Sequence, residues 1–115
     1  MKIIVQKFGG TSVATPATRE KVVGKVQEAI AQGYSPIVVV SAMGRRGDPF
    51  ATDTMIDMLK SVNPNPAPHE LDLLMACGEI ISSTVMAATL QEKGLKAKAL
   101  TGGQAGMITD DEYGN

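Results

Sequence analysis

Apolar residues near the N-terminus change from a consecutive run to helical spacing and back to a run. Residues 3–5 are short, β-branched and apolar, which is typical of a parallel strand covered on both faces. Thr15 followed by Pro16 predicts a helix start, and Gly33 predicts the helix end after a series of apolar residues at helical spacing. Residues 36–40 repeat the pattern of a buried strand. The sequence therefore predicts a strand-helix-strand unit with a right-handed crossover, which indicates the α/β fold class.

The middle of the chain is predicted to be mostly irregular. Glycines, a proline and two arginines between residues 41 and 53 favour a loop that follows the second strand. Residues 54–59 could form a short helix. The prolines within residues 63–68 then predict an extended connection, because each proline disfavours helix in the residue before it.

A long helical pattern dominates the last third of the chain. Apolar positions keep a helical period over residues 69–93, with Gly78 as the weak point in the middle. Residues 97–100 are predicted to form a third strand, and a second glycine-rich loop follows at 101–106. No repeat, low-complexity tract or linker divides the chain, so residues 1–115 are expected to form one domain portion without an internal boundary.

The amino-acid composition limits the kinds of molecule that this chain is expected to bind. The chain has 115 residues, 43% of them hydrophobic, which allows one hydrophobic core. Its net charge of -1, from 11 basic and 12 acidic residues, lacks the positive field that a nucleic-acid-binding protein uses. No apolar stretch approaches the roughly 20 residues of a membrane span, and the N-terminus lacks a signal-peptide pattern. Cys77 is the one cysteine, which excludes an internal disulfide and fits a reducing cytoplasm.

Two glycines follow the first predicted strand directly. In an open parallel sheet, ligands collect at the carboxyl ends of the strands. Gly9 and Gly10 would let backbone N–H groups approach a phosphate and adopt positive φ where needed. Lys7 adds a positive charge at the strand exit, and the helix behind adds its positive end. The sequence thus predicts an anion site, with an ordinary strand-to-helix turn and a solvated lysine as the open alternative.

Several blocks of the sequence, in order, resemble one enzyme family. Residues 7–13, Lys-Phe-Gly-Gly-Thr-Ser-Val, are similar to the opening signature of the aspartate kinases, a branch of the amino-acid kinase superfamily. Residues 38–44, 74–82 and 101–106 also resemble that family, as does the closing Tyr-Gly-Asn at 113–115. The resemblance implies a three-layer α/β/α fold with a mainly parallel sheet, of which this chain is the N-terminal part. The sequence of the chain is most similar to that of a monofunctional bacterial aspartate kinase.

The resemblance also implies an activity. Aspartate kinases transfer the γ-phosphoryl group of ATP to the side-chain carboxylate of L-aspartate, the first step towards lysine, threonine and methionine. The implied cofactors are ATP and Mg²⁺, the implied location is cytoplasmic, and the full-length enzyme is expected to be a homo-oligomer that binds neither nucleic acid nor membrane. Because the family's adenine and metal sites lie beyond the residues present, this chain is expected to be inactive alone. Three alternatives remain: a non-catalytic phosphate-binding module, half a fold that dimerises over its exposed sheet edge, and a sister kinase with another acceptor.

Residues on the ATP side of the site are implied by position within the matched blocks. Lys7 is the implied catalytic residue, with an ammonium that bridges phosphoryl oxygens as charge shifts in the transition state. Ser41, at the end of the second strand, is implied to join the phosphate site, although a hydroxyl that caps local backbone is the alternative. The implied ATP and phosphate-binding set is Lys7, Phe8, Gly9, Gly10 and Ser41.

Residues on the substrate side are implied in the same way. Glu79 would pair with the α-ammonium of aspartate, because a carboxylate in a mostly apolar helix is costly to bury without a partner; a solvent-facing glutamate is the alternative. Thr52 is expected to bind substrate, since Thr52 and Asp53 precede a predicted helix, but Gly47 and Asp48 lie at the spacing that is commoner in the family. No metal ligand can be named in this chain.

Overall fold

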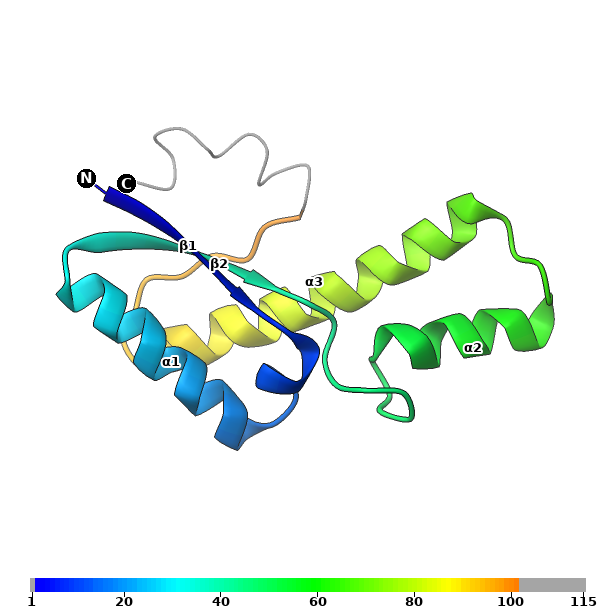
Figure 1. Cartoon of the computed structure of the whole chain (residues 1–115), viewed down its shortest axis with the longest axis horizontal. Helices are drawn as coiled ribbons and strands as arrows, with labels where there is room; N and C mark the ends of the chain where they lie inside the picture. The colour runs from blue at the N-terminus through cyan, green and yellow to red at the C-terminus, as the bar shows by residue number, and fades with distance from the viewer. Residues whose placement is uncertain (1, 102–115) are drawn as a thin grey trace.

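The computed structural model of the chain describes residues 2–101, which form a two-stranded parallel sheet with helices packed beside it (Figure 1). The elements in order are β1 (Lys2–Phe8), η1, a single 3-10 turn (Gly10–Ser12), α1 (Pro16–Ala31), β2 (Tyr34–Val40), α2 (Thr52–Val62) and α3 (Pro68–Glu92). α2 and the N-terminal part of α3 extend away from the sheet as a helical hairpin, while the C-terminal part of α3 packs beside α1 and the sheet (Figure 1).

The predicted strand-helix-strand unit is confirmed. β1 and β2 pair in parallel along their whole length, from Lys2 opposite Tyr34 to Phe8 opposite Val40, so both strands are longer than their apolar runs. The Thr15 side chain caps α1 by accepting a hydrogen bond from the Thr18 N–H at 3.1 Å, which satisfies one of the unpaired donors at the helix start.

The helical predictions hold for the rest of the chain, with different boundaries. α2 begins at Thr52, earlier than its apolar pattern suggested, and ends at Val62. α3 runs unbroken through Gly78. A side chain at Gly78 would collide with the Met55 methyl group and lie 3.1 Å from the Ala42 Cβ. The glycine therefore allows α3 to pack closely on its neighbours instead of weakening the helix.

The predicted third strand is wrong in this structure. Residues 95–101 have no regular secondary structure, although Leu95 and Ala97 pack against the core. A strand needs the hydrogen bonds of a neighbouring strand, and the described sheet contains β1 and β2 alone. The predicted glycine-rich loop lies outside the described residues from its second position onwards, as does the closing block at 113–115.

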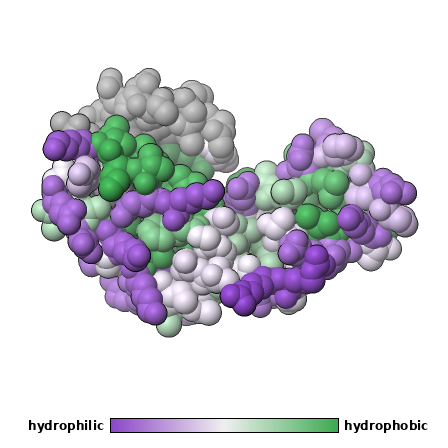
Figure 2. Space-filling view, in the orientation of Figure 1, coloured by the Kyte–Doolittle hydropathy of each residue, from purple (hydrophilic) through white to green (hydrophobic). Residues whose placement is uncertain are grey.

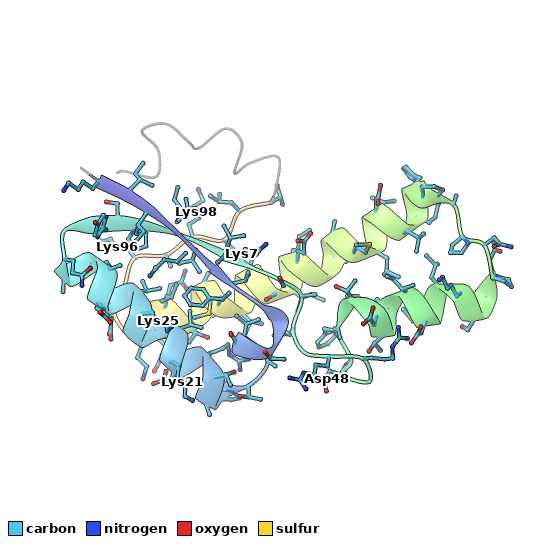
Figure 3. The ribbon with its side chains drawn as sticks, viewed as in Figure 1. Lys7, Lys21, Lys25, Asp48, Lys96 and Lys98 are labelled. Carbon is cyan, nitrogen blue, oxygen red and sulfur yellow. The ribbon has the colours of Figure 1, made fainter. Side chains whose placement is uncertain are left out.

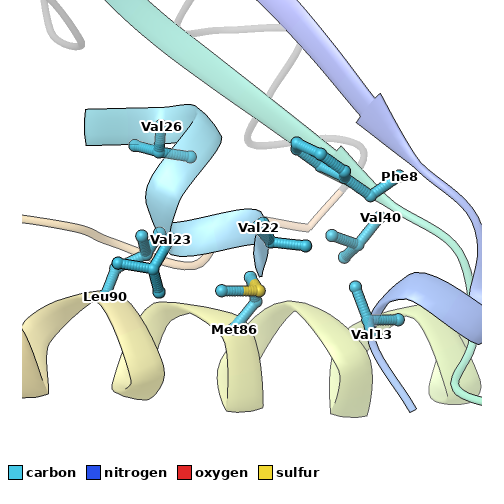
Figure 4. Packing of buried hydrophobic residues seen from close by; sticks show 8 residues of the cluster. All are labelled: Phe8, Val13, Val22, Val23, Val26, Val40, Met86 and Leu90. Carbon is cyan, nitrogen blue, oxygen red and sulfur yellow. The ribbon is translucent and has the colours of Figure 1, made fainter. Parts of the chain in front are cut away.

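The core is mostly aliphatic, with Phe8 as its aromatic member, and joins the sheet to two helices. Phe8 and Val40, paired across the strands, face α1 and α3 (Figure 4). α1 contributes three valines and α3 contributes a methionine and a leucine. The buried cluster consists of Phe8, Val13, Val22, Val23, Val26, Val40, Met86 and Leu90.

The opposite face of the sheet is uncovered in the described part of the chain. Ile3 is 48% exposed, Val5 64% and Val39 41%, and Figure 2 shows apolar surface over the strands. Parallel sheets in α/β proteins normally have both faces covered. The α/β class and the parallel sheet are confirmed, and the third layer stays a prediction.

α3 changes one conclusion drawn from the sequence. Among residues 2–101, this 25-residue helix is long and apolar enough to cross a membrane by length and composition alone, so the expectation that no segment approaches a span was wrong by that measure. Core helices meet the same test. Gly78, Ser82, Met86 and Leu90 form a buried stripe on α3, and Met86 and Leu90 belong to the core shared with α1 and β2.

Candidate functional site

The loops that follow β1 and β2 are joined by backbone hydrogen bonds. The Ser41 N–H donates to the Phe8 carbonyl at 3.1 Å, and the Gly44 N–H donates to the Gly10 carbonyl at 2.9 Å. Ser41 therefore lies beside the glycine turn, as the order of the strands predicted. The two loops form one surface at the carboxyl end of the sheet, where α/β proteins bind ligands.

The two glycines of the first loop have different environments. A Cβ on Gly10 would lie 2.6 Å from the Ala42 carbonyl oxygen and 2.8 Å from the Gly44 carbonyl oxygen, whereas a Cβ on Gly9 would meet nothing within 4 Å. Neither glycine has a positive φ. Gly10 is therefore needed for close approach of the second loop, and Gly9 borders the open space in which a ligand could lie. The positive φ that these glycines could adopt where needed is therefore used at neither position, and their role in binding a phosphate stays a prediction.

The turn itself is a short 3-10 segment placed before α1. The Ser12 N–H donates to the Gly9 carbonyl at 3.1 Å and the Val13 N–H donates to the Gly10 carbonyl at 3.4 Å. The first N–H groups of such a turn have no acceptor within it and are available to an anion. α1 begins only at Pro16, behind this turn and with its own threonine cap, so the unpaired donors nearest the strand end are those of the 3-10 turn and not those of α1.

Lys7 and Phe8 point to opposite sides of the sheet, as successive strand residues must. Lys7 is exposed near the carboxyl end of β1, on the face that α1 does not cover (Figure 3). The Phe8 side chain is buried in the core. Of the two, only Lys7 can present its side chain to a ligand, and Phe8 can reach one through its backbone alone.

The second loop is held in a tight turn by its own side chains. Gly44 and Gly47 have φ values of 90° and 101°, a region that glycine enters without strain. The Asp48 carboxylate accepts a hydrogen bond from the Arg45 N–H at 2.9 Å, and the Gly47 N–H donates to the Thr54 hydroxyl at 2.8 Å. The Asp48 side chain is therefore engaged in the loop, which disfavours the alternative substrate pair at residues 47–48.

Thr52 opens α2 and is half-buried, while Arg46 crosses to the same helix. The Arg46 guanidinium forms ion pairs with Asp57 and, at 3.7 Å, with Asp53. The hydrogen bond to Asp57, together with the charges of both carboxylates, raises the pKa of Arg46. These carboxylates hold Arg46 on α2, so the guanidinium tethers the loop instead of extending towards a phosphate.

Glu79 lies beside a cavity, and its neighbour Gly78 packs against Ala42 of the second loop. The cavity, of about 430 Å³, is enclosed mainly by apolar residues of β2, α3 and residues 95–101, with Glu79 and Ser83 among its polar lining residues. Glu79 is exposed, so the argument that this carboxylate is buried and needs a partner was wrong. Its place at a cavity still leaves it accessible to a small cationic group.

One residue that sequence reasoning missed links the loops from the outside. Arg19, on α1, donates from Nη1 to the Val13 carbonyl at 2.9 Å and to the Met43 sulfur at 3.9 Å. Val13 ends the first turn and Met43 belongs to the second loop. The amphipathic pattern of α1 gave no signal for this contact, because it depends on how the two loops fold back over the helix.

Comparison with known proteins agrees with this arrangement. Residues 2–114 match the model of the Amino acid kinase family. The whole chain is 53% identical to Aspartokinase 1 of Bacillus subtilis strain 168 and 43% identical to Aspartokinase of Geobacillus stearothermophilus, and it spans 28% and 27% of their lengths. The aspartate kinase of Synechocystis superposes on 79% of the chain, and on 15% of its own length, with a TM-score of 0.71 at 40% identity.

The family match is not confined to the glycine turn. It runs through both strands, both strand-end loops and all three α-helices of the described structure. The fold gives the same result, because the solved aspartate kinase structure superposes on 79% of the chain with a TM-score of 0.71. On this evidence the chain belongs to the amino acid kinase family.

Proposed function

We propose that this chain is the N-terminal part of an aspartate kinase catalytic domain. The proposed reaction is attack of the L-aspartate side-chain carboxylate on the γ-phosphorus of ATP, which forms a phosphorus–oxygen bond and releases ADP. The products are 4-phospho-L-aspartate and ADP, and the reaction would be the first step towards lysine, threonine and methionine. Identity of 53% over the full chain to a protein named Aspartokinase 1 supports this choice of acceptor.

The joined loops are the observation that carries the proposal. Phosphoryl transfer depends mainly on positioning and on neutralising charge around the transferring group. Gly9 leaves open space at the turn, Lys7 is an exposed cation beside it, and Ser41 is held next to it by its bond to Phe8. In this assignment the N–H groups of the turn bind the phosphates and the Lys7 ammonium stabilises charge on the transferring phosphoryl group.

The substrate side is assigned to Glu79 and Thr52. Glu79, beside its cavity, would pair with the α-ammonium of aspartate, and Thr52 would offer its hydroxyl from the start of α2. ATP would be used as its Mg²⁺ complex, because unshielded phosphates repel a carboxylate nucleophile. Residues 2–101 contain no cluster of three or more His, Cys, Asp or Glu side chains that fits a metal ion, and the proposal assigns none of these residues to the metal.

The uncovered sheet face supports the view that this chain is part of a larger domain. Ile3, Val5 and Val39 expose apolar surface on the face opposite the core, and further helices of a three-layer domain would cover it. We therefore propose that the chain is inactive alone. The full-length enzyme is proposed to be a cytoplasmic homo-oligomer that binds neither nucleic acid nor membrane.

The test is acceptor-dependent phosphorylation by the full-length enzyme. Trapping of the acyl phosphate with hydroxylamine, with ATP and L-aspartate present, should give aspartyl hydroxamate, and L-glutamate in place of aspartate should give none. Product with another amino acid in place of aspartate would assign the protein to a sister kinase. ATP binding without product for any acceptor would instead support a non-catalytic phosphate-binding module.

A further inference from the structure

Arg19 is the one side chain described that bridges the two strand-end loops through α1. Its backbone is fixed, because the Arg19 N–H closes the first turn of α1 by donating to the Thr15 carbonyl at 2.9 Å. Thr15 and Thr18 in turn form a reciprocal capping box. The guanidinium therefore projects from a rigid part of the helix.

The first acceptor of Arg19 is a buried carbonyl. Val13 is fully buried, with 0% exposure, so water cannot reach its carbonyl oxygen. Buried carbonyls need a hydrogen-bond donor, and one left without a donor is costly. The Arg19 Nη1 supplies that donor at 2.9 Å. The end of the glycine turn is thus held in place by a charged donor from α1.

The second acceptor belongs to the other loop. Met43 packs against the core, and its sulfur lies 3.9 Å from the same Arg19 nitrogen. One residue further along, the Gly44 N–H donates to the Gly10 carbonyl. The two loops are therefore connected in two ways, directly by backbone hydrogen bonds and indirectly through Arg19.

We propose that Arg19 is a positioning residue for the phosphate site. By holding Val13 and Met43 together, it fixes the spacing between the glycine turn and Ser41, although it does not itself contact a ligand. This inference rests on the proposed function, because it assigns ATP phosphates to the turn. Displacing groups that position a reacting phosphate by about 1 Å can cost up to about 100-fold in rate.

The test compares Arg19→Met with Lys21→Met in the full-length enzyme. Both changes remove one positive charge from α1, and Lys21 is exposed, so the second variant is a matched control. Arg19→Met is expected to lower kcat/KM for ATP by about 10- to 100-fold and to raise KM for ATP, with KM for aspartate unchanged. Lys21→Met is expected to match the wild type.

A purely structural role gives a different result. Loss of folded protein lowers the apparent kcat in proportion and leaves both Michaelis constants unchanged, so that outcome overturns the proposal, as does an equal ATP defect in Lys21→Met. If Arg19→Met does not fold, Arg19→Lys replaces it. Lysine keeps the charge and a donor for Val13 but loses the planar guanidinium, and it should show a smaller defect that is still specific for ATP. Wild-type constants in Arg19→Lys would then overturn the inference.

The failure of the proposed function can be told apart from failure of this inference. If the wild type uses an acceptor other than aspartate, the ATP constants with that acceptor still test Arg19. If no acceptor is turned over, the dissociation constant for ATP, measured by calorimetry on the same variants, is the readout. A wild type that binds no ATP, or equal affinities in all variants, would overturn the role of Arg19.

Discussion

Replacement of Gly10 by alanine would test whether this glycine is needed for close packing of the two loops, as distinct from a role in binding a ligand. The added Cβ would lie 2.6 Å from the Ala42 oxygen, 2.8 Å from the Gly44 oxygen and 3.3 Å from the Gly44 nitrogen. All three atoms belong to backbone, which cannot move aside as the end of a flexible side chain can. Gly10 has no positive φ, so alanine is excluded by the neighbouring loop and not by its own conformation.

The expected destabilisation follows from two contributions. Forcing an extra methyl group into a close-packed site typically costs about 1–3 kcal/mol. The loops must then separate, which weakens the hydrogen bond from the Gly44 N–H to the Gly10 carbonyl, worth about 0.5–1.5 kcal/mol. Together they predict that Gly10→Ala lowers the local stability of the joined loops by about 1.5–4.5 kcal/mol.

The assay is amide hydrogen exchange in the full-length enzyme, which reports local opening. A loss of about 2 kcal/mol should speed exchange of the Gly44 N–H by about 30-fold, since about 1.4 kcal/mol corresponds to a factor of ten. Gly9→Ala is the matched control, because its Cβ meets nothing within 4 Å and its φ of -76° suits alanine. It should leave Gly44 exchange unchanged and weaken ATP binding. Unchanged exchange in Gly10→Ala would refute the close-approach argument.

Three further predictions concern single charges. Lys7→Met should lower kcat of the full-length enzyme while its melting temperature stays unchanged, because Lys7 is exposed; equal turnover in the folded variant would remove its catalytic role. Glu79→Gln should raise KM for aspartate much more than KM for ATP in steady-state kinetics, and the reverse pattern would contradict the assignment. The hydrogen bond to Glu20 and its charge raise the pKa of Lys93. The pair therefore stabilises the fold below the unfolded-state pKa of Lys93, and this stability is lost as pH rises through the raised folded-state value. The free energy of unfolding, measured in urea at a series of alkaline pH values, should fall over this range in the wild type by more than in Lys93→Met.

Features that depend on neighbouring residues were predictable from the sequence. Thr15 with Pro16 marked the start of α1, and Gly33, with a φ of 91°, marked its end. These signals work because caps and left-handed glycines are set by contacts within one turn of the chain. The strand pair was predictable for a related reason, since the helix between two buried runs restricts them to a parallel arrangement.

Features that depend on distant residues were not predictable. Gly9 and Gly10 are identical in the sequence, and only the return of Ala42 and Gly44 makes them different. The wrong prediction of a strand at residues 97–100 has the same cause. The local sequence shows strand propensity, but whether a segment pairs with another strand depends on distant residues. Glu79 was misjudged because α3 is apolar nearly all round, so its pattern does not show which face is buried.

The two sides of the proposed site therefore differ in how they are built. The backbone links between the loops and the Arg19 contacts lie within residues 8–44, whereas Asp48, Thr54 and α2 hold the rest of the second loop. The proposed phosphate side therefore lies mostly within the strand-helix-strand unit, and in the proposed role of Arg19 its helix holds the two loops together. The substrate side depends on α3 and on residues 95–101, which border a cavity without pairing to β2. The proposed function therefore predicts that ATP phosphates bind at the strand-helix-strand unit, while selection of the acceptor requires the remainder of the sheet to fix the wall opposite Glu79.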